Sequence, residues 1–218
     1  MRWPRIGMGL FAIVIAVMAW RAFAPPPALH EGDLIFQTSK SHQSSAILAA
    51  TFSLYTHMGI VAKRDGAWVV IEAAGPVKET PLKAWAARGR FGRYAVYRRP
   101  NLTAQQTAVI LKSARALKGR PYDLFFSFDN QAIYCSELPW LAYRSAGVPV
   151  GQLQTIGSLH IANALVERLI ASRSGRDRAC AGLDAGQCKA VILKRDLVTP
   201  VSIANDRSLR QIYSNYPF

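Results

Sequence analysis

The sequence predicts an α+β fold in which an antiparallel sheet packs against helices. Three observations predict it. Short apolar runs that suit strands alternate with separate segments that have helical spacing. Two of the runs flank Asp65-Gly66, a dipeptide that favours a two-residue hairpin turn. The chain has 218 residues, of which 50% are hydrophobic, and this suits one domain with a full core.

The start of the chain predicts an export signal or a membrane anchor. Arg2 and Arg5 precede an apolar run over residues 6–20, and Ala22-Phe23-Ala24 suits a signal peptidase. Pro25 follows this tripeptide directly and disfavours cleavage, so retention as an anchor is slightly favoured over removal. The body of the protein is therefore expected outside the cytoplasm, in the periplasm or elsewhere in the cell envelope.

Three segments are expected along the chain. Residues 1–24 form the signal or anchor, with residues 6–24 in the membrane, and residues 25–31 form a stiff proline-rich linker. Residues 32–218 form the folded domain. The chain carries 27 Lys and Arg against 13 Asp and Glu, a formal charge of +14. In an exported protein this charge favours anionic lipid or envelope polymer as a partner, or a solvated surface, rather than nucleic acid.

The strands are expected where short, largely apolar runs occur. They lie at residues 33–37, 57–63, 67–74 and 93–99, with a late strand at 189–195. A two-residue loop at Asp65-Gly66 places Gly59 opposite Glu72. His57 and Gly59 point to the same face, so Glu72 lies diagonally from His57, within reach of its side chain. A three-residue loop would put the two on opposite faces.

Four helices are expected. Residues 44–55 show apolar positions that cluster on one side. The clearest helix covers residues 103–119, with Thr103 as the N-cap and Gly119 as the stop. Two more are expected at 135–147 and 157–172.

Cys135 is a candidate nucleophile because it lies where an irregular segment meets the helix expected at 135–147. Free N–H groups at a helix N-terminus stabilise a thiolate and bind an oxyanion. A thiol nucleophile needs a base, and the base needs an orienting group. Of the four histidines, His57 is the best placed, and Glu72 is an unusual residue within an apolar strand. Taken singly, each of these residues fits a structural role in the core or on the surface. Their joint placement favours Cys135 as nucleophile, His57 as base and Glu72 as orienter.

Cys180 and Cys188 flank a short loop that contains glycine, and exported proteins tend to pair their cysteines. A local disulfide between them is therefore predicted, which leaves Cys135 as the odd thiol. Two cysteines are too few for a structural zinc site. The alternative is that all three cysteines are buried thiols.

Several stretches together resemble the permuted papain-like amidases, the YaeF/YiiX group of the NlpC-type cysteine hydrolase superfamily. They are "GDLIFQTSKSHQSSAI", "YTHMGIV", "VIEA" and "GRPYDLFFSFDNQAIYCSELPW", and they run from Gly32 to Trp140. The resemblance implies a circularly permuted papain-like fold and a Cys-His-Glu triad. Cys135 falls in "YCSEL", His57 in "HMGIV" and Glu72 in "VIEA".

The resemblance also implies substrate-binding residues. Tyr122 ends a Gly-x-Pro-Tyr element, and Gln37 and Ser41 belong to the loop "FQTSKS". Tyr134 stands where peptidoglycan peptidases of the superfamily carry an acid that holds a substrate amine. This departure argues against specificity for a stem-peptide amine.

The expected function is that of an envelope-located cysteine hydrolase that cleaves amide bonds through an acyl-enzyme, with no metal or organic cofactor. One alternative is a lipid acyl hydrolase or acyltransferase of the lecithin-retinol acyltransferase kind, which Phe125, Phe126 and Phe128 leave open. Another is an envelope binding module that has lost turnover. An apolar groove beside Cys135 would favour acyl chains, and a polar cleft would favour peptides.

Overall fold

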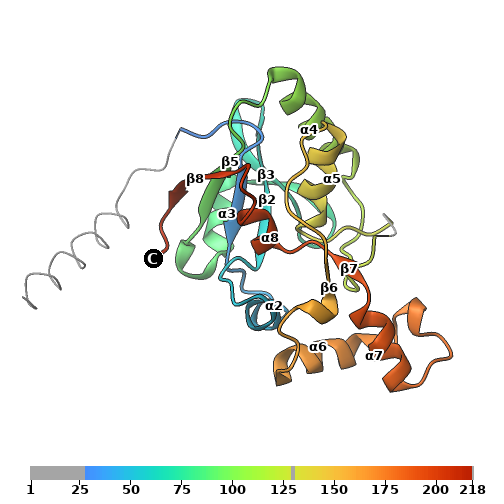
Figure 1. The fold of residues 1–218 in the computed structure, drawn as a ribbon. Coiled ribbons are helices and arrows are strands. Elements are labelled where there is room, and N and C mark those ends of the chain that lie inside the picture. Colours follow the sequence, from blue (N-terminus) through green and yellow to red (C-terminus); the bar gives the residue numbers. More distant parts are fainter. Residues whose placement is uncertain (1–27, 129–130, 218) are drawn as a thin grey trace, which may run out of the picture.

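The computed structural model describes residues 28–128 and 131–217 (Figure 1). The expected signal or anchor, and residues 25–27 of the linker, therefore lie outside the described residues. Among the residues that are described, no helix is both long enough and apolar enough to cross a membrane.

A six-stranded sheet forms the centre of the fold, and every pairing within it is antiparallel. Its order is β4-β3-β2-β1-β5-β8. The strands are β1 (Leu34–Gln37), β2 (His57–Arg64), β3 (Ala67–Ala73), β4 (Val77–Pro81), β5 (Ala95–Arg98) and β8 (Arg210–Ser214). A separate pair joins β6 (Gln154–Thr155) to β7 (Asp196–Leu197). The expected α+β fold with an antiparallel sheet is confirmed.

The hairpin between β2 and β3 has the predicted register. Ile60 lies opposite Ile71, and Arg64 lies opposite Ala67. The loop is therefore Asp65-Gly66 alone, and both residues have positive φ, at 53° and 79°. This backbone twist matches the twist of the flanking strands.

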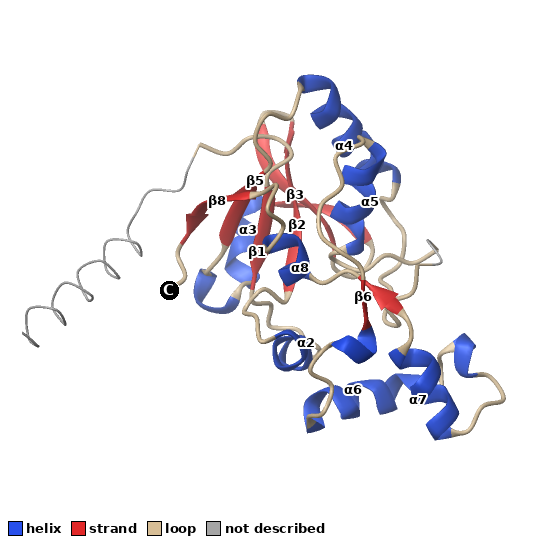
Figure 2. Cartoon of the chain, viewed as in Figure 1, coloured by secondary structure: helices blue, strands red, loops and turns tan. Residues whose placement is uncertain are grey.

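The helices surround the sheet (Figure 2). They are α2 (Ser44–Thr51), α3 (Leu82–Arg88), α4 (Ala104–Ala116), α5 (Glu137–Ser145), α6 (Ala164–Ser174), α7 (Ala185–Leu193) and α8 (Pro200–Ala204), with short 3-10 turns η1 (Arg90–Gly92), η2 (Ile156–Ser158) and η3 (Arg178–Cys180). The larger core packs α4 and α5 on one face of the sheet, and Trp85 of α3 packs on the other. Both faces are thus buried over the inner strands, which explains why β1, β2 and β3 are largely apolar, whereas the edge strands β4 and β8 are more polar.

Helix α4 begins as predicted, because Thr103 and Gln106 form a capping box at its N-terminus. The helix predicted at 44–55 ends earlier, at Thr51, where Phe52 turns left-handed with φ of 50°. The helix predicted at 157–172 begins only at Ala164, because the side chain of Asn163 accepts a hydrogen bond from the backbone N–H of Val166.

The late strand predicted at 189–195 is wrong, since most of it belongs to α7. Asp184 and Gln187 form a capping box that starts this helix. Cys188 and Ile192, four positions apart, are the buried side chains of the helix. The short apolar run suits a strand or a helix by its composition, and the cap in front of it favours the helix.

Candidate active site

His57 and Glu72 meet at the open end of the β2–β3 hairpin. The His57 Nε2 atom lies 2.6 Å from Oε2 of Glu72. The carboxylate is fully buried, and its Oε1 atom accepts hydrogen bonds from Thr80 Oγ1, at 2.6 Å, and from Arg88 Nη2. Burial raises the pKa of Glu72, but the hydrogen bonds from His57 and Thr80 and the charge of Arg88 outweigh it, and the pKa falls to about 2. Glu72 is therefore an ionised group that holds the imidazole.

Gly59 makes this approach possible. A side chain there would place its Cβ atom 2.7 Å from the carbonyl oxygen of Ile71 and 3.3 Å from Cβ of Glu72. The backbone of β3 leaves no room for that atom, so glycine alone fits beside the carboxylate.

Cys135 lies in the turn that leads into α5. The helix begins at Glu137 with Ser136 as its N-cap, so the thiol precedes the helix rather than opening it as predicted. The Ser136 hydroxyl donates to the carbonyl oxygen of Val198 at 2.8 Å, which ties the turn to the C-terminal part of the chain. Pro139 is the third helical residue, where the missing N–H costs no hydrogen bond within the helix.

The thiol and the imidazole shift each other's pKa. Burial raises the pKa of Cys135, but the hydrogen bond with His57, the charge of His57 and the hydrogen bond with Tyr122 lower it below its ordinary value overall. Burial lowers the pKa of His57, but its hydrogen bonds with Cys135 and Glu72 raise it to about 9. Because Nε2 of His57 is occupied by Glu72, Nδ1 remains for the thiol. The arrangement favours a thiolate–imidazolium pair, the reactive form of a cysteine nucleophile.

Alkylation of Cys135 by iodoacetamide is expected to proceed below pH 7, well under the pKa of about 8.5 of a free thiol. In His57→Ala the burial of the thiol is no longer opposed by the imidazole, so its pKa rises and labelling at pH 7 falls at least about tenfold. Mass spectrometry of the labelled peptide measures this. An unchanged pH profile in His57→Ala would show that the two groups are not coupled.

Two hollows adjoin the site. The first, the polar cleft, is lined by His57 and by polar or charged side chains that include Gln37, Ser41, Gln43, Arg88 and Tyr122. The Tyr122 hydroxyl accepts a hydrogen bond from Nε2 of Gln43 at 2.8 Å. The structure therefore brings three of the predicted substrate-binding residues, Gln37, Ser41 and Tyr122, to one cleft beside the predicted base.

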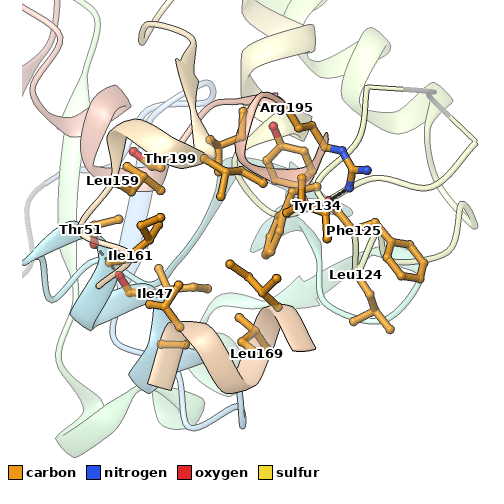
Figure 3. A pocket seen from close by; sticks show the side chains of 18 of the residues that line it. Ile47, Thr51, Leu124, Phe125, Tyr134, Leu159, Ile161, Leu169, Arg195 and Thr199 are labelled. Carbon is orange, nitrogen blue, oxygen red and sulfur yellow. Dashed lines mark hydrogen bonds between the residues drawn. The ribbon is translucent and has the colours of Figure 1, made fainter. Parts of the chain in front are cut away.

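Cys135 belongs to the wall of the second hollow, the apolar pocket. Figure 3 shows this pocket from close by. Side chains of α2 and α6 supply most of the opposite wall: Ala46, Ile47, Ala50, Val166, Leu169 and Ile170. Tyr134 also lines the pocket, and its hydroxyl accepts a hydrogen bond from the backbone N–H of Val198 at 3.1 Å. The fourth predicted substrate-binding residue therefore lies in an apolar wall, away from the other three.

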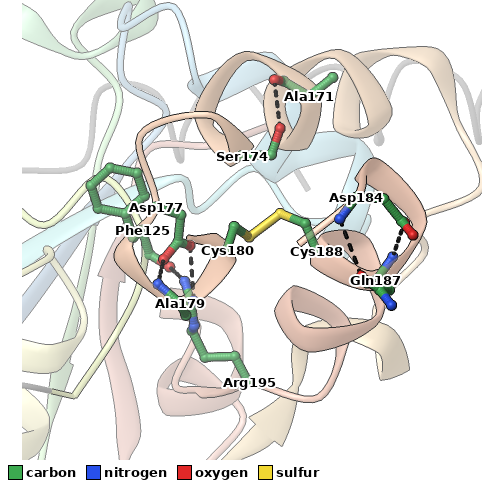
Figure 4. The surroundings of a disulfide bond; sticks show 10 residues. All are labelled: Phe125, Ala171, Ser174, Asp177, Ala179, Cys180, Asp184, Gln187, Cys188 and Arg195. Carbon is green, nitrogen blue, oxygen red and sulfur yellow. Dashed lines mark hydrogen bonds and ion pairs between the residues drawn. A yellow bond between two sulfur atoms is a disulfide. The ribbon is translucent and has the colours of Figure 1, made fainter. Parts of the chain in front are cut away.

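A disulfide joins Cys180 to Cys188, with Cα atoms 4.9 Å apart, and links η3 to α7 (Figure 4). Asp177, the N-cap of η3, pairs with Arg195 at 2.8 Å. Arg195 also donates to the carbonyl oxygen of Phe125 at 2.6 Å. The cross-linked segment therefore supports the loop that leads to Cys135.

Sequence reasoning missed the residues that hold Glu72 from behind. Thr80 lies on β4 and Arg88 ends α3, and neither element was expected. The available signal was Glu72 itself, because a carboxylate within a buried strand requires hydrogen-bonding partners. Its partners come from elements that follow it closely in the chain.

The chain is similar to known proteins in sequence and in fold. The model of the permuted papain-like amidase enzymes, YaeF/YiiX, C92 family, matches residues 28–213. The uncharacterized protein YiiX of Escherichia coli (strain K12) is 34% identical over 198 residues, which cover 90% of this chain and 91% of that protein. A crystal structure described as the metalloprotein YiiX from Escherichia coli O157:H7 matches with a TM-score of 0.76 and 35% identity, over 85% of this chain and 97% of that one.

That description calls the Escherichia coli protein a metalloprotein. In residues 28–128 and 131–217, no three or more His, Cys, Asp or Glu side chains come together in a way that could hold a metal ion. No residue set is therefore assigned to a metal. The family model and the sequence of YiiX match nearly all of the described chain, and the fold matches a solved structure of YiiX. The chain therefore belongs to the YaeF/YiiX family of permuted papain-like amidases.

Proposed function

We propose that the protein is a cysteine hydrolase of the cell envelope that cleaves amide bonds through a thioester on Cys135. The proposal rests on two side-chain contacts between buried residues: the Cys135 thiol contacts His57, and His57 contacts Glu72. The chain belongs to a family of amidases, and this supports the same class of reaction. The envelope location rests on the apolar, arginine-flanked start of the sequence.

The proposed reaction needs only these side chains and water. His57 takes the thiol proton, and the Cys135 thiolate attacks the substrate carbonyl carbon. The backbone N–H of Cys135 is proposed to donate to the oxyanion. When the C–N bond breaks, His57 gives its proton to the leaving amine, and a thioester remains. His57 then takes a proton from water, whose oxygen attacks the thioester, and the thiol and a carboxylic acid are released.

The apolar pocket favours a particular acyl group. The acyl part of the substrate stays bonded to Cys135 after the leaving group departs, and Cys135 is part of the pocket wall. A long hydrocarbon chain would bury its surface against α2 and α6, at about 0.8 kcal/mol for each methylene. This supports an N-acyl amide as the substrate. It also supports, as the second candidate, a lipid acyl ester cleaved by the same residues.

Hydrolysis is expected to depend strongly on the acyl chain. With acetyl, octanoyl and dodecanoyl p-nitroanilides, kcat/KM should rise at least about 100-fold from acetyl to octanoyl, because several methylenes are buried. In Ala50→Phe, the added ring fills the pocket, so dodecanoyl turnover should fall far more than acetyl turnover. Initial rates of p-nitroaniline release measure both.

Leu48→Phe is the matched control, because Leu48 lies on the same helix but is exposed and outside the pocket. A chain-length profile that is flat in the wild type would contradict the acyl-chain assignment while leaving an amidase. If no anilide is cleaved and Cys135 is never acylated by mass spectrometry, the hydrolase proposal itself is wrong.

A further inference from the structure

The two hollows meet beside the nucleophile. Leu124, Leu169 and Arg173 line both the apolar pocket and the polar cleft. Cys135 lines only the pocket, and His57 lines only the cleft. A substrate carbonyl at Cys135 therefore has an apolar space on one side and a polar space on the other.

The chemistry assigns one half of the substrate to each space. The acyl group remains on Cys135, so it belongs to the pocket. The leaving group receives its proton from His57, so its departing atom must lie within hydrogen-bond reach of that ring. The rest of the leaving group then extends along the cleft that His57 lines.

The cleft is basic. Lys40, Arg88 and Arg173 line it, and no Asp or Glu is among the lining residues in the described part of the chain. Glu72, which lies behind His57, is fully buried and already accepts from His57, Thr80 and Arg88. Its charge is therefore held within the triad and does not offset the other cations of the cleft.

Arg173 is the cation that most needs an anion. It is partly buried on α6, and its guanidinium donates to the carbonyl oxygen of Leu124 at 2.5 Å and to Oε1 of Gln43 at 2.7 Å. Both acceptors are uncharged. Within the described ranges no carboxylate lies within 4.0 Å of its nitrogens, whereas Arg98 and Arg195 each have one. The burial of Arg173 is offset only in part by the charge of Asp123, and the pKa of Arg173 stays below its ordinary value. A bound anion in contact with the guanidinium would remove the remaining cost.

We propose that the polar cleft binds a leaving group that carries a carboxylate or a phosphate, held by Arg173 and Lys40. The inference rests on the proposed hydrolase function and names the second half of its substrate. The preferred substrate is thus an apolar acyl chain joined to a small anionic amine or alcohol.

Matched esters test the proposal. The first pair is the dodecanoyl ester of 4-hydroxybenzoate and that of 4-hydroxybenzamide, which differ in the charge of the leaving group. The kcat/KM of the anionic ester should exceed that of the neutral one about tenfold at low ionic strength, as one charge-assisted contact allows. Salt at 1 M, where the Debye length is about 3 Å, should reduce the ratio. A second pair, dodecanoyl glycerol phosphate and dodecanoyl glycerol, shows whether phosphate is preferred to carboxylate.

Lys40→Glu should lower the ratio for the first pair about fivefold, since Lys40 is exposed in a loop and its replacement leaves the fold intact. Arg173→Gln should lower it further. Arg168→Glu is the control. Arg168 lies exposed on α6, outside the cleft, and its replacement by glutamate changes the net charge by the same amount as Lys40→Glu.

The outcomes separate the two proposals. Equal kcat/KM for the charged and neutral esters, or a ratio that Lys40→Glu and Arg168→Glu lower equally, would overturn the anionic leaving group and leave the hydrolase standing. Failure of both esters to acylate Cys135 would overturn the hydrolase, and the leaving-group assignment with it.

Discussion

Replacement of Cys135 by alanine is expected to lower kcat/KM for every acyl substrate by about 10⁴-fold or more, because no covalent intermediate can form. Cys135→Ser should be almost as inactive, since a hydroxyl does not ionise beside His57 as the thiol does. Both substitutions are small, and the thiol is buried in a turn whose hydrogen bonds come from Tyr134 and Ser136 rather than from the thiol. The unfolding temperature should therefore change little.

The measurement is single-turnover release of p-nitroaniline, with thermal unfolding followed in parallel. Trapping supplies a second readout: the wild type should accumulate a thioester with a slowly hydrolysed dodecanoyl ester, and Cys135→Ala should accumulate none. A Cys135→Ala variant that keeps a tenth of the activity would show that another group is the nucleophile. A Cys135→Ala variant that restores full function in cells would support the binding-module alternative instead.

Glu72→Gln should have the second-largest effect, a loss of about 10²–10⁴-fold in kcat. Glutamine presents one acceptor and one NH₂ group, whereas the carboxylate accepts from His57 on one side and from Thr80 and Arg88 on the other. The NH₂ group of the glutamine must then face another hydrogen-bond donor, either His57 or the pair Thr80 and Arg88. The loss of charge also lowers the pKa of His57 from about 9, because burial is opposed only by Cys135. The alkaline limb of the pH–rate profile should therefore move to lower pH.

Glu79→Gln is the matched control for this substitution. Glu79 lies on the neighbouring strand β4 with its side chain 6% exposed, and it pairs with Arg115 at 2.9 Å instead of with the triad. Its replacement by glutamine is the same chemical change. Its activity profile against pH should be that of the wild type even if its stability falls. If Glu72→Gln and Glu79→Gln lose activity equally and keep the same pH limbs, Glu72 acts through stability and does not orient His57.

The sequence was most informative where local chemistry sets the geometry. Asp65-Gly66 allows a two-residue turn, the turn sets the register, and the register places Glu72 on the face of His57. Thr103 likewise sets the start of α4 through its hydroxyl. In these cases neighbouring residues determine the outcome, so the prediction required nothing from distant parts of the chain.

Long-range packing determines what the sequence did not show. The apolar run before Arg195 has no period that separates strand from helix, and it is helical because Cys188 and Ile192 find a core on one side. Arg88 reaches Glu72 from a seven-residue helix without strong sequence signals. The apolar pocket joins α2 to α6, which are more than a hundred residues apart, and pairwise spacing along the chain does not reveal such a contact.

The disulfide has a consequence for how this fold can diversify. It joins two cysteines eight positions apart within the η3–α7 segment and connects no part of the sheet. The disulfide therefore does not cross-link the strands and the turn that carry His57, Glu72 and Cys135 to the helices that line the apolar pocket. Under the proposed function, substitutions in those helices would change which acyl chain is bound while His57, Glu72 and Cys135 keep their contacts.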